Sequence, residues 1–468
     1  MNDPDSETAL VVGSAPAMSA SSGGSNPDAV EEGALDPRAI LEQWAIGTSG
    51  GAYMAGLENR PVIERTQGSY LYDTKGNAYL DFGSGQMGGA LGHNHPKIAA
   101  SIRESAERAI HSTNTYLNVD RLRLHEKLGK LLTAPLQKSL FLVTGSDSVE
   151  AAVDLARKAT GGTEVLSFHT GLHGSTSFVT RSLSFAWERK RHAINAPSIA
   201  PILAPHCYRC PVKQTFPSCD YLCLEVSLEL ADAHFPAKPA AIVTEPIMSA
   251  GGIIEPPPGY MQELRKAADE RGMLLVNDEA QTGLGKTGRV WGHEHSGVVP
   301  DVMAVSKHFG GGVPISAVCA TAVAADAAVE NGYFATRSHA TDPLLCAAGS
   351  ASLDILVDED IPGKAAAIEA RIKEHFTELG NDCELVGDIR GRGVLLGIEL
   401  VEEREHKTPA NAAAQHVLDY CQRAGLILQL RGTQGDRNVL RLVPPMTTSA
   451  ADVDKALNIL SEAILGAR

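Results

Sequence analysis

The chain has 468 residues, which is enough for two or three structural units and a large core. Its hydrophobic content of 43% and charged content of 21% are typical of a soluble globular protein. A net charge of −15 argues against nucleic acid and anionic membranes as partners, and no apolar run reaches the roughly 18 residues of a membrane helix.

The N-terminal segment predicts a tail followed by a small β-structure. Residues 1–35 are rich in Ser, Gly, Ala, Asp and Glu, which predicts a disordered tail. Its first residues are acidic and the first arginine is Arg38, so we expect no targeting signal and a cytoplasmic location. Residues 36–47 predict a short helix with Asp36 as N-cap. Residues 68–82 predict a β-hairpin around a Lys75-Gly76-Asn77 turn.

The middle of the chain alternates between strand and helix patterns. Several predicted strands are continuous apolar runs, which favours a mostly parallel sheet covered on both faces. We expect strands at 139–144, 164–169, 240–247, 273–279, 301–306 and 315–321, with helices such as 147–160 and 259–272 between them. This pattern predicts a large α/β domain over residues 85–345.

The C-terminal part has a different pattern. Helical patterns cover 358–380, 411–425 and 451–467, and strand-like patterns cover 386–401 and 438–445. We therefore expect a smaller α+β domain built from both ends of the chain, residues 36–84 and 346–468.

Four of the eight cysteines lie close together in the sequence. The spacing CxxC followed by CxxxC could hold zinc. Because the loop between the two pairs is short, we favour reduced thiols in a surface insertion. The residues are Cys207, Cys210, Cys219 and Cys223.

Asp278 and Lys307 are the residues that most directly predict a chemistry. Asp278 ends an apolar strand, where a buried carboxylate is costly unless it is paired, for example with a protonated pyridine nitrogen. Lys307 follows another apolar strand and precedes three glycines, so its amine could reach a ligand above the strand ends. An acid and a lysine in these positions indicate pyridoxal phosphate (PLP) chemistry. The alternatives are a turn aspartate and an exposed lysine.

Four further residues fit such a cofactor. Gly145 and Ser146 join a strand to a helix, whose N-terminal N–H groups can bind a phosphate, although such a turn can also simply cap a helix. Gln281 could donate a hydrogen bond to the 3-oxygen of the PLP ring. Glu245, at a strand end, could position the cofactor or a gating arginine, or could be an ordinary buried glutamate.

The segment from Asn277 to Lys307 resembles the class III (subgroup II) aminotransferases of PLP fold type I, and the resemblance spans roughly residues 55–465. Within that family it is closest to the 2,2-dialkylglycine decarboxylase branch, through residues 84–96, 245–261 and 441–447. The resemblance implies PLP as cofactor and an amino acid and a keto acid as substrates. It also implies a homodimer or dimer of dimers with the site at the dimer interface.

The resemblance assigns roles by position. Lys307 would bind PLP covalently and Asp278 would face the ring nitrogen. Gly145 and Ser146 would hold the phosphate, and Gln281 would contact the ring 3-oxygen.

Two more residues would act on the substrate. Arg441 would bind the substrate carboxylate, a task suited to guanidinium geometry, and its alternative is a surface ion pair. Gln86 would hold the departing carboxylate near perpendicular to the ring, and its alternative is a turn glutamine. Both roles together favour a decarboxylating transaminase that converts an α,α-dialkyl or simple α-amino acid to CO2 and a ketone, with a keto acid as acceptor. The alternatives are a non-decarboxylating aminotransferase, an amino-acid racemase, or a protein of this fold without catalysis.

The chain departs from the family pattern in places. Leu172 stands where an aromatic residue usually stacks on the cofactor, which would cost roughly 0.5–1.5 kcal/mol of contact. Ser338 replaces a threonine that binds the phosphate across the dimer interface, and the neighbouring Arg337 could meet a phosphate or a carboxylate. Asp342 matches an alkali-metal ligand of the decarboxylase, since oxygen-rich sites suit hard cations.

Overall fold

The computed structural model describes residues 61–184, 196, 198–432 and 435–467. Residues 63–468 form one compact unit. The predicted tail (1–35) and the predicted helix at 36–47 lie outside the described residues. Within the described ranges, no helix has both the length and the apolar content needed to cross a membrane.

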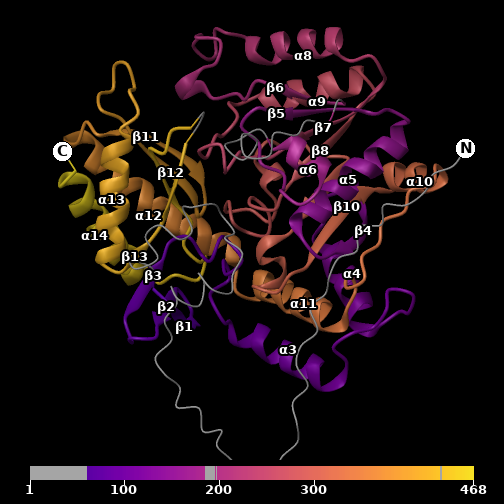
Figure 1. Cartoon of the computed structure of the whole chain (residues 1–468), viewed down its shortest axis with the longest axis horizontal. Helices are drawn as coiled ribbons and strands as arrows, with labels where there is room; N and C mark the ends of the chain where they lie inside the picture. Colours follow the sequence, from indigo (N-terminus) through magenta and orange to yellow (C-terminus); the bar gives the residue numbers. More distant parts are fainter. Residues whose placement is uncertain (1–60, 185–195, 197, 433–434, 468) are drawn as a thin grey trace, which may run out of the picture. The chain divides into compact units, whose positions relative to one another are not determined.

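A seven-stranded sheet forms the centre of this unit (Figure 1). β10 runs antiparallel to its neighbours β4 and β9, and the other neighbouring pairs are parallel. All six predicted strands are confirmed. β6 was missed, because four residues that include a proline give a weak strand pattern. In sheet order the strands are β4 (Leu136–Leu142), β10 (Ser316–Thr321), β9 (Val302–Val305), β8 (Leu274–Asp278), β7 (Pro239–Thr244), β5 (Glu164–Phe168) and β6 (Ile199–Ile202).

Helices cover both faces of this sheet because alternate strand residues point to opposite sides. In β7, Ala241 and Val243 pack in a core with α5 (Gly145–Thr160) and α10 (Ala322–Glu330). Ile242 between them packs in a second core with α8 and α9. The remaining helices of this region are α3 (Pro96–Arg108), α4 (Val119–Leu131), α6 (Phe178–Leu183), α8 (Leu222–His234), α9 (Tyr260–Glu270) and α11 (Pro343–Asp358).

The predicted N-terminal hairpin is confirmed and pairs with the C-terminal part of the chain. Asp73 stabilises its turn by accepting hydrogen bonds from the backbone N–H groups of Lys75 and Asn77, at 3.0 and 2.8 Å. The sheet runs β1 (Ile63–Gln67), β2 (Tyr70–Asp73), β3 (Ala78–Asp81) and β13 (Leu426–Ile427), with β3 and β13 parallel. Strands from both ends of the chain therefore share one sheet.

A second four-stranded sheet belongs to the C-terminal part. The strand-like segment 386–401 is a hairpin of two strands, which turns at Gly393 with φ 57°. The sheet runs β11 (Val386–Arg392), β12 (Leu395–Leu400), β15 (Val439–Leu442) and β14 (Gln429–Arg431), and the helices are α12 (Ile361–Asp382), α13 (Asn411–Arg423) and α14 (Ala450–Leu465). The domain boundaries near residues 84 and 345 stay a prediction.

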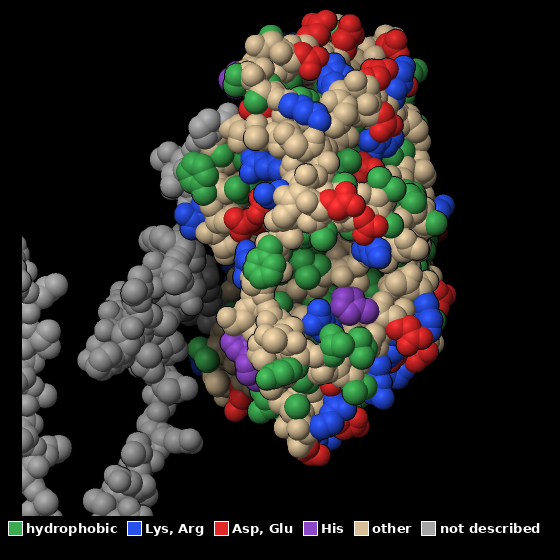
Figure 2. Space-filling view, turned by 90° about the vertical axis from the view of Figure 1, so that its right-hand side faces the viewer, with side chains coloured by type: hydrophobic (Ala, Val, Ile, Leu, Met, Phe, Trp, Pro, Cys, Tyr) green, Lys and Arg blue, Asp and Glu red, His purple; other side chains and the backbone are tan. Residues whose placement is uncertain are grey.

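The surface carries both signs of charge. Figure 2 shows one face of the molecule, on which acidic and basic side chains are mixed with hydrophobic ones. The acidic side chains on this face do not form a single acidic patch.

Candidate active site

A cavity of about 410 Å³ lies at the C-terminal ends of the central parallel strands, where open α/β sheets bind ligands. The segments that follow β4, β5, β7, β8 and β9 line it. This cleft brings together most of the predicted site residues, namely Gly145, Ser146, Leu172, Glu245, Asp278, Gln281 and Lys307.

Lys307 follows β9 and enters the cleft from a left-handed backbone conformation, with φ 59°. This conformation costs a non-glycine residue roughly 1–2 kcal/mol, so the surrounding fold holds it in place. Lys307 lines the cavity, and its side chain is exposed in the absence of a ligand. Burial and the positive charge of Arg441 lower the pKa of Lys307, and the charge of Asp278 opposes them. The lowered pKa increases the neutral, nucleophilic fraction of the amine.

Asp278, the last residue of β8, forms a buried pair with His173. Its Oδ2 lies 3.0 Å from His173 Nδ1, and its Oδ1 accepts a hydrogen bond from the Ala280 N–H at 3.1 Å. Burial disfavours a charge on His173, but the hydrogen bond and the charge of Asp278 outweigh it and raise the pKa of the imidazole. The contact of His173 with Asp278 was not predicted from the sequence.

The N-terminus of α5 presents backbone N–H groups to the cleft. Thr144 caps the helix in a reciprocal pair with Asp147, with hydrogen bonds of 3.1 and 3.2 Å. Gly145 and Ser146 follow the cap and line the cavity. A Cβ on Gly145 would lie 2.7 Å from Ser306 Oγ, so a side chain here would force Ser306 to shift. The helix dipole and these N–H groups form a cradle for an anion such as a phosphate.

Glu245 follows β7 and holds two backbone segments at the cleft. It accepts hydrogen bonds from the N–H groups of Leu172 and Ser249, both at 3.1 Å. Burial and the charge of Asp278 raise the pKa of Glu245 to about 7, against the opposing effect of His173. Glu245 therefore fixes the turn that carries Leu172.

Arg441 lies on β15 with 3% of its surface exposed. Its Nη1 lies 3.4 Å from Ser249 Oγ and 3.5 Å from Gln281 Oε1, and its Nη2 donates to Gln429 Oε1. Burial and the positive charge of Arg431 lower the pKa of Arg441, and Glu245 opposes them. Among the described residues no carboxylate forms an ion pair with Arg441, so the predicted alternative of a surface ion pair is not found.

Gln86 lies in a tight turn beside the cleft, and its side chain does not line the cavity. Ser84, Gly85, Gln86 and Met87 all have positive φ, and Asp81 holds the turn by accepting from the N–H groups of its glycines. Gly88 of the same turn reaches the cavity. The structure thus brings the turn to the cleft and leaves the Gln86 side chain exposed.

Ser338 and Asp342 lie outside the cleft. Ser338 is exposed, and the neighbouring Arg337 pairs with Asp147 and Glu150 of α5, at 3.1 and 3.7 Å. The two oxygens of Asp342 contact the Nδ1 atoms of His111 and His339, at 2.6 and 2.7 Å. Among the described residues, these three are the group of potential metal-binding side chains whose ligand atoms all lie within 4.8 Å.

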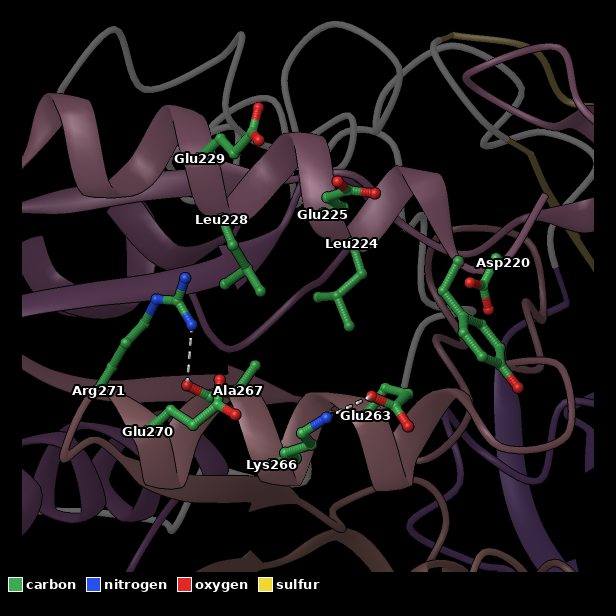
Figure 3. Close-up of a pocket in the computed structure, with 11 residues that line it drawn as sticks. Asp220, Leu224, Glu225, Leu228, Glu229, Glu263, Lys266, Ala267, Glu270 and Arg271 are labelled. Carbon is green, nitrogen blue, oxygen red and sulfur yellow. Dashed lines mark hydrogen bonds and ion pairs between the residues drawn. The ribbon is translucent and has the colours of Figure 1, made fainter.

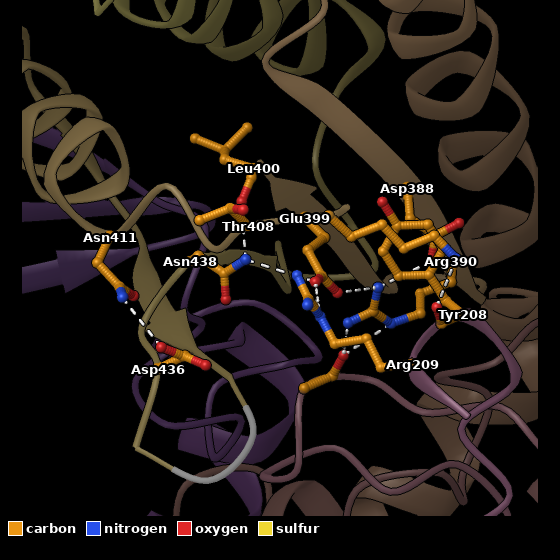
Figure 4. Close-up of polar contacts among 12 residues, drawn as sticks. Tyr208, Arg209, Asp388, Arg390, Glu399, Leu400, Thr408, Asn411, Asp436 and Asn438 are labelled. Atoms are coloured by element: carbon orange, nitrogen blue, oxygen red, sulfur yellow. Dashed lines mark hydrogen bonds and ion pairs between the residues drawn. The ribbon is translucent and has the colours of Figure 1, made fainter. Parts of the chain in front are cut away.

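The four cysteines of the predicted insertion line a small cavity at the N-terminal end of α8, as free thiols. The neighbouring Arg209 donates to Glu399 of β12, which also pairs with Arg390 at 2.6 Å (Figure 4). Arg390 donates to the carbonyl of Gly252 at 2.9 Å. This network links the hairpin β11–β12 to the segment after β7 that carries Ser249.

Another cavity, of about 450 Å³, lies between α8 and α9 (Figure 3). Charged side chains of both signs, among them Glu225, Lys266 and Arg271, surround it. It contains none of the predicted site residues, so the chemistry of the lining, rather than the cavity volume, identifies the active site.

The cleft fits PLP. It offers an amine of lowered pKa, a buried carboxylate that can face the ring nitrogen, and an N–H cradle for the phosphate. With the mostly parallel central sheet, these features define a PLP-dependent enzyme of fold type I.

The chain belongs to the aminotransferase class-III family, whose model matches residues 53–464. It is 34% identical over 407 residues to an uncharacterized aminotransferase of Schizosaccharomyces pombe, covering 86% of this chain and 90% of the relative. It is 32% identical to the leucine/methionine racemase of Thermococcus litoralis over 86% of this chain and 90% of the relative. It is also 32% identical to the acetylornithine aminotransferase of Methanopyrus kandleri, over 92% and 99%.

Solved structures have the same fold. A Bacillus anthracis aminotransferase superposes with a TM-score of 0.85 at 26% identity, covering 92% of this chain and 98% of the other. A PLP-bound amine transaminase from an uncultivated Pseudomonas species superposes with a TM-score of 0.80 at 28% identity, covering 90% and 97%. The predicted class III family, PLP fold type I and PLP dependence are therefore confirmed.

Proposed function

We propose that the chain transfers an amino group between an α-amino acid and a keto acid, with the substrate carboxylate bound by Arg441. The observation that carries this proposal is the buried guanidinium of Arg441, whose described hydrogen bonds go to the neutral oxygens of Ser249, Gln281 and Gln429. A bidentate carboxylate would satisfy its charge. PLP, when bound, supplies an electron sink for the bond that breaks at the substrate α-carbon.

The residues of the cleft have complementary roles in this proposal. Asp278, held by His173, would place a negative charge near the ring nitrogen. Gly145 and Ser146 would donate N–H groups to the phosphate. Lys307 would hold the cofactor covalently, and its amine would move a proton to and from the substrate carbon. The lowered pKa of Lys307 suits both tasks, because a neutral amine is the form that attacks a carbonyl and accepts a proton.

We also propose that the enzyme is a homodimer. Ile110, Tyr116, Leu117 and Phe334 are large hydrophobic residues that are 61–83% exposed. The two segments that carry them are adjacent, since Asn118 donates to the carbonyl of Thr341 at 2.8 Å. A hydrophobic surface of this kind is typical of a subunit interface. A dimer formed through this surface would place Ser338 next to the partner subunit. Light scattering of the purified protein tests this assembly.

Decarboxylation is a second candidate reaction. In its favour, the turn that carries Gln86 borders the site. Gly88 of this turn lines the cleft. Gly83 lies close to Gln429, since a Cβ on Gly83 would lie 3.5 Å from Gln429 Nε2. Racemisation is the third, because a relative is a leucine/methionine racemase. The alkali ion at Asp342 and the cytoplasmic location stay predictions from the sequence; the two imidazoles beside Asp342 suit transition metals better than an alkali ion.

One experiment separates these candidates. PLP-loaded enzyme is incubated with a panel of α-amino acids, including 2-aminoisobutyrate, and with a keto acid, while keto product, CO2 and chirality are followed together. Amino transfer without CO2 supports the leading proposal, CO2 from 2-aminoisobutyrate supports decarboxylation, and racemised substrate without keto product supports the racemase. Lys307→Ala is the control and should abolish all three. A wild-type protein that catalyses none of them, and that shows no PLP absorbance removed by Lys307→Ala, would contradict an enzymatic role.

A further inference from the structure

A cavity of about 250 Å³ lies beside β8 and the start of α9, apart from the catalytic cleft. Among the described residues, the two cavities share no lining residue. Its rim carries the ion pair of Arg392 with Glu255. We call it the proline-lined cavity, because its apolar walls are Pro246, Ile247, Pro256, Pro257, Pro258 and Met261.

Asn277 lies in the wall of the proline-lined cavity, with 0% of its surface exposed. It precedes Asp278 on β8, and successive residues of a strand point to opposite faces, so Asp278 lines the cleft and Asn277 lines the other cavity. Neither Oδ1 nor Nδ2 of Asn277 has a hydrogen-bond partner among the described residues. A buried amide without these hydrogen bonds is costly, so we expect a molecule in the cavity to supply them.

His293 lies in the same wall, with 2% of its surface exposed. Its Nδ1 lies 3.0 Å from Glu279 Oε1, which also accepts from the N–H of His293 at 2.8 Å. Because a carboxylate accepts hydrogen bonds, the proton of the neutral imidazole belongs on Nδ1, and Nε2 is left as an acceptor. Nε2 has no partner in the described part of the chain. The wall therefore presents one donor, Asn277 Nδ2, and two acceptors, Asn277 Oδ1 and His293 Nε2.

These three atoms complement a primary carboxamide, whose carbonyl oxygen accepts and whose NH2 group donates two hydrogen bonds. The amino edge of adenine offers the same set, because an acceptor nitrogen lies beside an NH2 group. A carboxylate fits poorly, since it can only accept and two of the three wall atoms are acceptors as well. The apolar walls suit the faces of a planar ring. Water can also satisfy these atoms, because the cavity has room for several molecules.

We propose that the proline-lined cavity binds a small planar molecule through a primary carboxamide or the equivalent amino edge of a nucleobase. The ring packs against the prolines and Met261, and its polar edge meets Asn277 and His293. The ligand then contacts the residue before Asp278 and, through His293, the residue after it, which is Glu279. The site is separate from the cleft and does not depend on the proposed reaction.

Calorimetry of PLP-loaded enzyme tests this site, because bound PLP occupies the cleft. The probes are benzamide and adenine, which represent the two sources of the amino edge, each with a matched probe that lacks the NH2 group, acetophenone and purine. We expect benzamide or adenine to bind as one molecule per chain, about 10- to 100-fold more tightly than its matched probe, since two hydrogen bonds are lost without the NH2 group. The tighter of the two identifies the ligand as a carboxamide or a nucleobase.

Asn277→Leu keeps the size of the side chain and removes its donor and its acceptor. It should weaken the bound probe by about 10- to 100-fold without lowering Tm, because the polar atoms that it removes have no protein partner. Lys266→Gln, a change of an exposed lysine of α9 at the cavity between α8 and α9, is the matched control and should leave the affinity unchanged.

Three results would overturn the site. They are no saturable binding of benzamide or adenine at about 10 mM, equal binding within each matched pair, and an affinity that Asn277→Leu does not change. The comparison of matched probes needs no variant, so it decides the matter even where Asn277→Leu fails to fold. A crystal structure of the PLP-loaded protein soaked with the probe that shows only ordered water on Asn277 would also overturn the site, because water would then be its occupant.

Discussion

Replacing Glu279 by glutamine should strongly destabilise the loop beside the active site. Glu279 follows Asp278 and has 1% of its surface exposed. Its Oε1 accepts from the N–H and Nδ1 of His293, at 2.8 and 3.0 Å. Its Oε2 accepts from the N–H of Gly292 at 2.9 Å and from Thr282 Oγ1 at 2.5 Å. One carboxylate therefore closes the segment that carries Gln281 at the cleft.

The magnitude follows from this count of accepted hydrogen bonds. Glutamine has the size of glutamate, but its NH2 group would face a backbone N–H, of Gly292 or of His293, which then loses its acceptor, whereas the Thr282 hydroxyl or the His293 ring can accept instead. A hydrogen bond to a charged group contributes about 1.5–3 kcal/mol, so the free energy of unfolding should fall by roughly that amount. Typical domains have about 5–15 kcal/mol in total.

The loss should also depend on pH. Burial alone would raise the pKa of Glu279, but the hydrogen bonds and charge of His293 outweigh it and lower the pKa. A carboxyl with a lowered folded pKa adds stability above its unfolded pKa of about 4.3, and that stability is lost as the pH falls through the folded value. The difference between wild type and Glu279→Gln should therefore be largest near pH 7 and shrink below about pH 4.

The assay is urea unfolding at pH 7 and at acidic pH, with saturating PLP in every sample because bound ligand stabilises the folded state. Glu126→Gln, a change on the surface of α4, is the matched control and should leave the midpoint unchanged. A loss below about 1 kcal/mol at pH 7, or a loss that does not shrink in acid, would refute the account of this carboxylate.

Three further predictions concern groups around the cleft. Lys286 is fully buried, its Nζ has no hydrogen-bond partner among the described residues, and burial lowers its pKa. Lys286→Met should therefore raise the free energy of unfolding in urea by about 1–3 kcal/mol. Wild-type stability should rise with pH toward 10.4, because only the unfolded chain holds this proton, and Lys286→Met should remove that rise. Asp278→Asn removes the charge paired with His173, so the affinity for PLP should fall about 10- to 100-fold in a fluorescence titration, and an unchanged affinity would contradict its role. Gly393 has a positive φ, and Gly393→Ala would place a Cβ 2.2 Å from the carbonyl oxygen of Lys286. Tm should therefore drop by several degrees in a thermal melt, about 2–4 °C for each kcal/mol lost. An unchanged Tm would show that the turn can relax.

Much of the fold could be predicted because its strands are short apolar runs between glycine-rich turns. β6, which was missed, lacks this signal because it has four residues with a proline. The segment 386–401 was predicted as strand-like, but its division into two strands was not predicted, because its glycines serve both as strand and as turn. The turn between β11 and β12 could not be located from the sequence, because it depends on the close approach of Gly393 to the segment at Lys286.

The site was predicted in part for a similar physical reason. Residues that end parallel strands must meet at one edge of the sheet, so Asp278, Glu245 and Lys307 could be placed together from sequence. The contact of His173 with Asp278 could not, because it depends on the loop after β5 folding across the edge to a strand that is not its neighbour. The same limit applies to the contact of Arg441 with Gln429, which forms only because β14 and β15 pair in one particular register.

The pairing of β3 with β13 has a consequence for the order in which the molecule is assembled. Leu80 pairs with Leu426, so the hairpin β2–β3 completes its sheet only after a segment far along the chain has been synthesised. The turn that carries Gln86 follows β3 directly and borders the cleft. During synthesis the central sheet can therefore form while the wall of the active site is still incomplete, and contacts between residues so far apart in the chain form late. A nascent chain that lacks β13 would leave β3, and the turn that follows it, without this pairing.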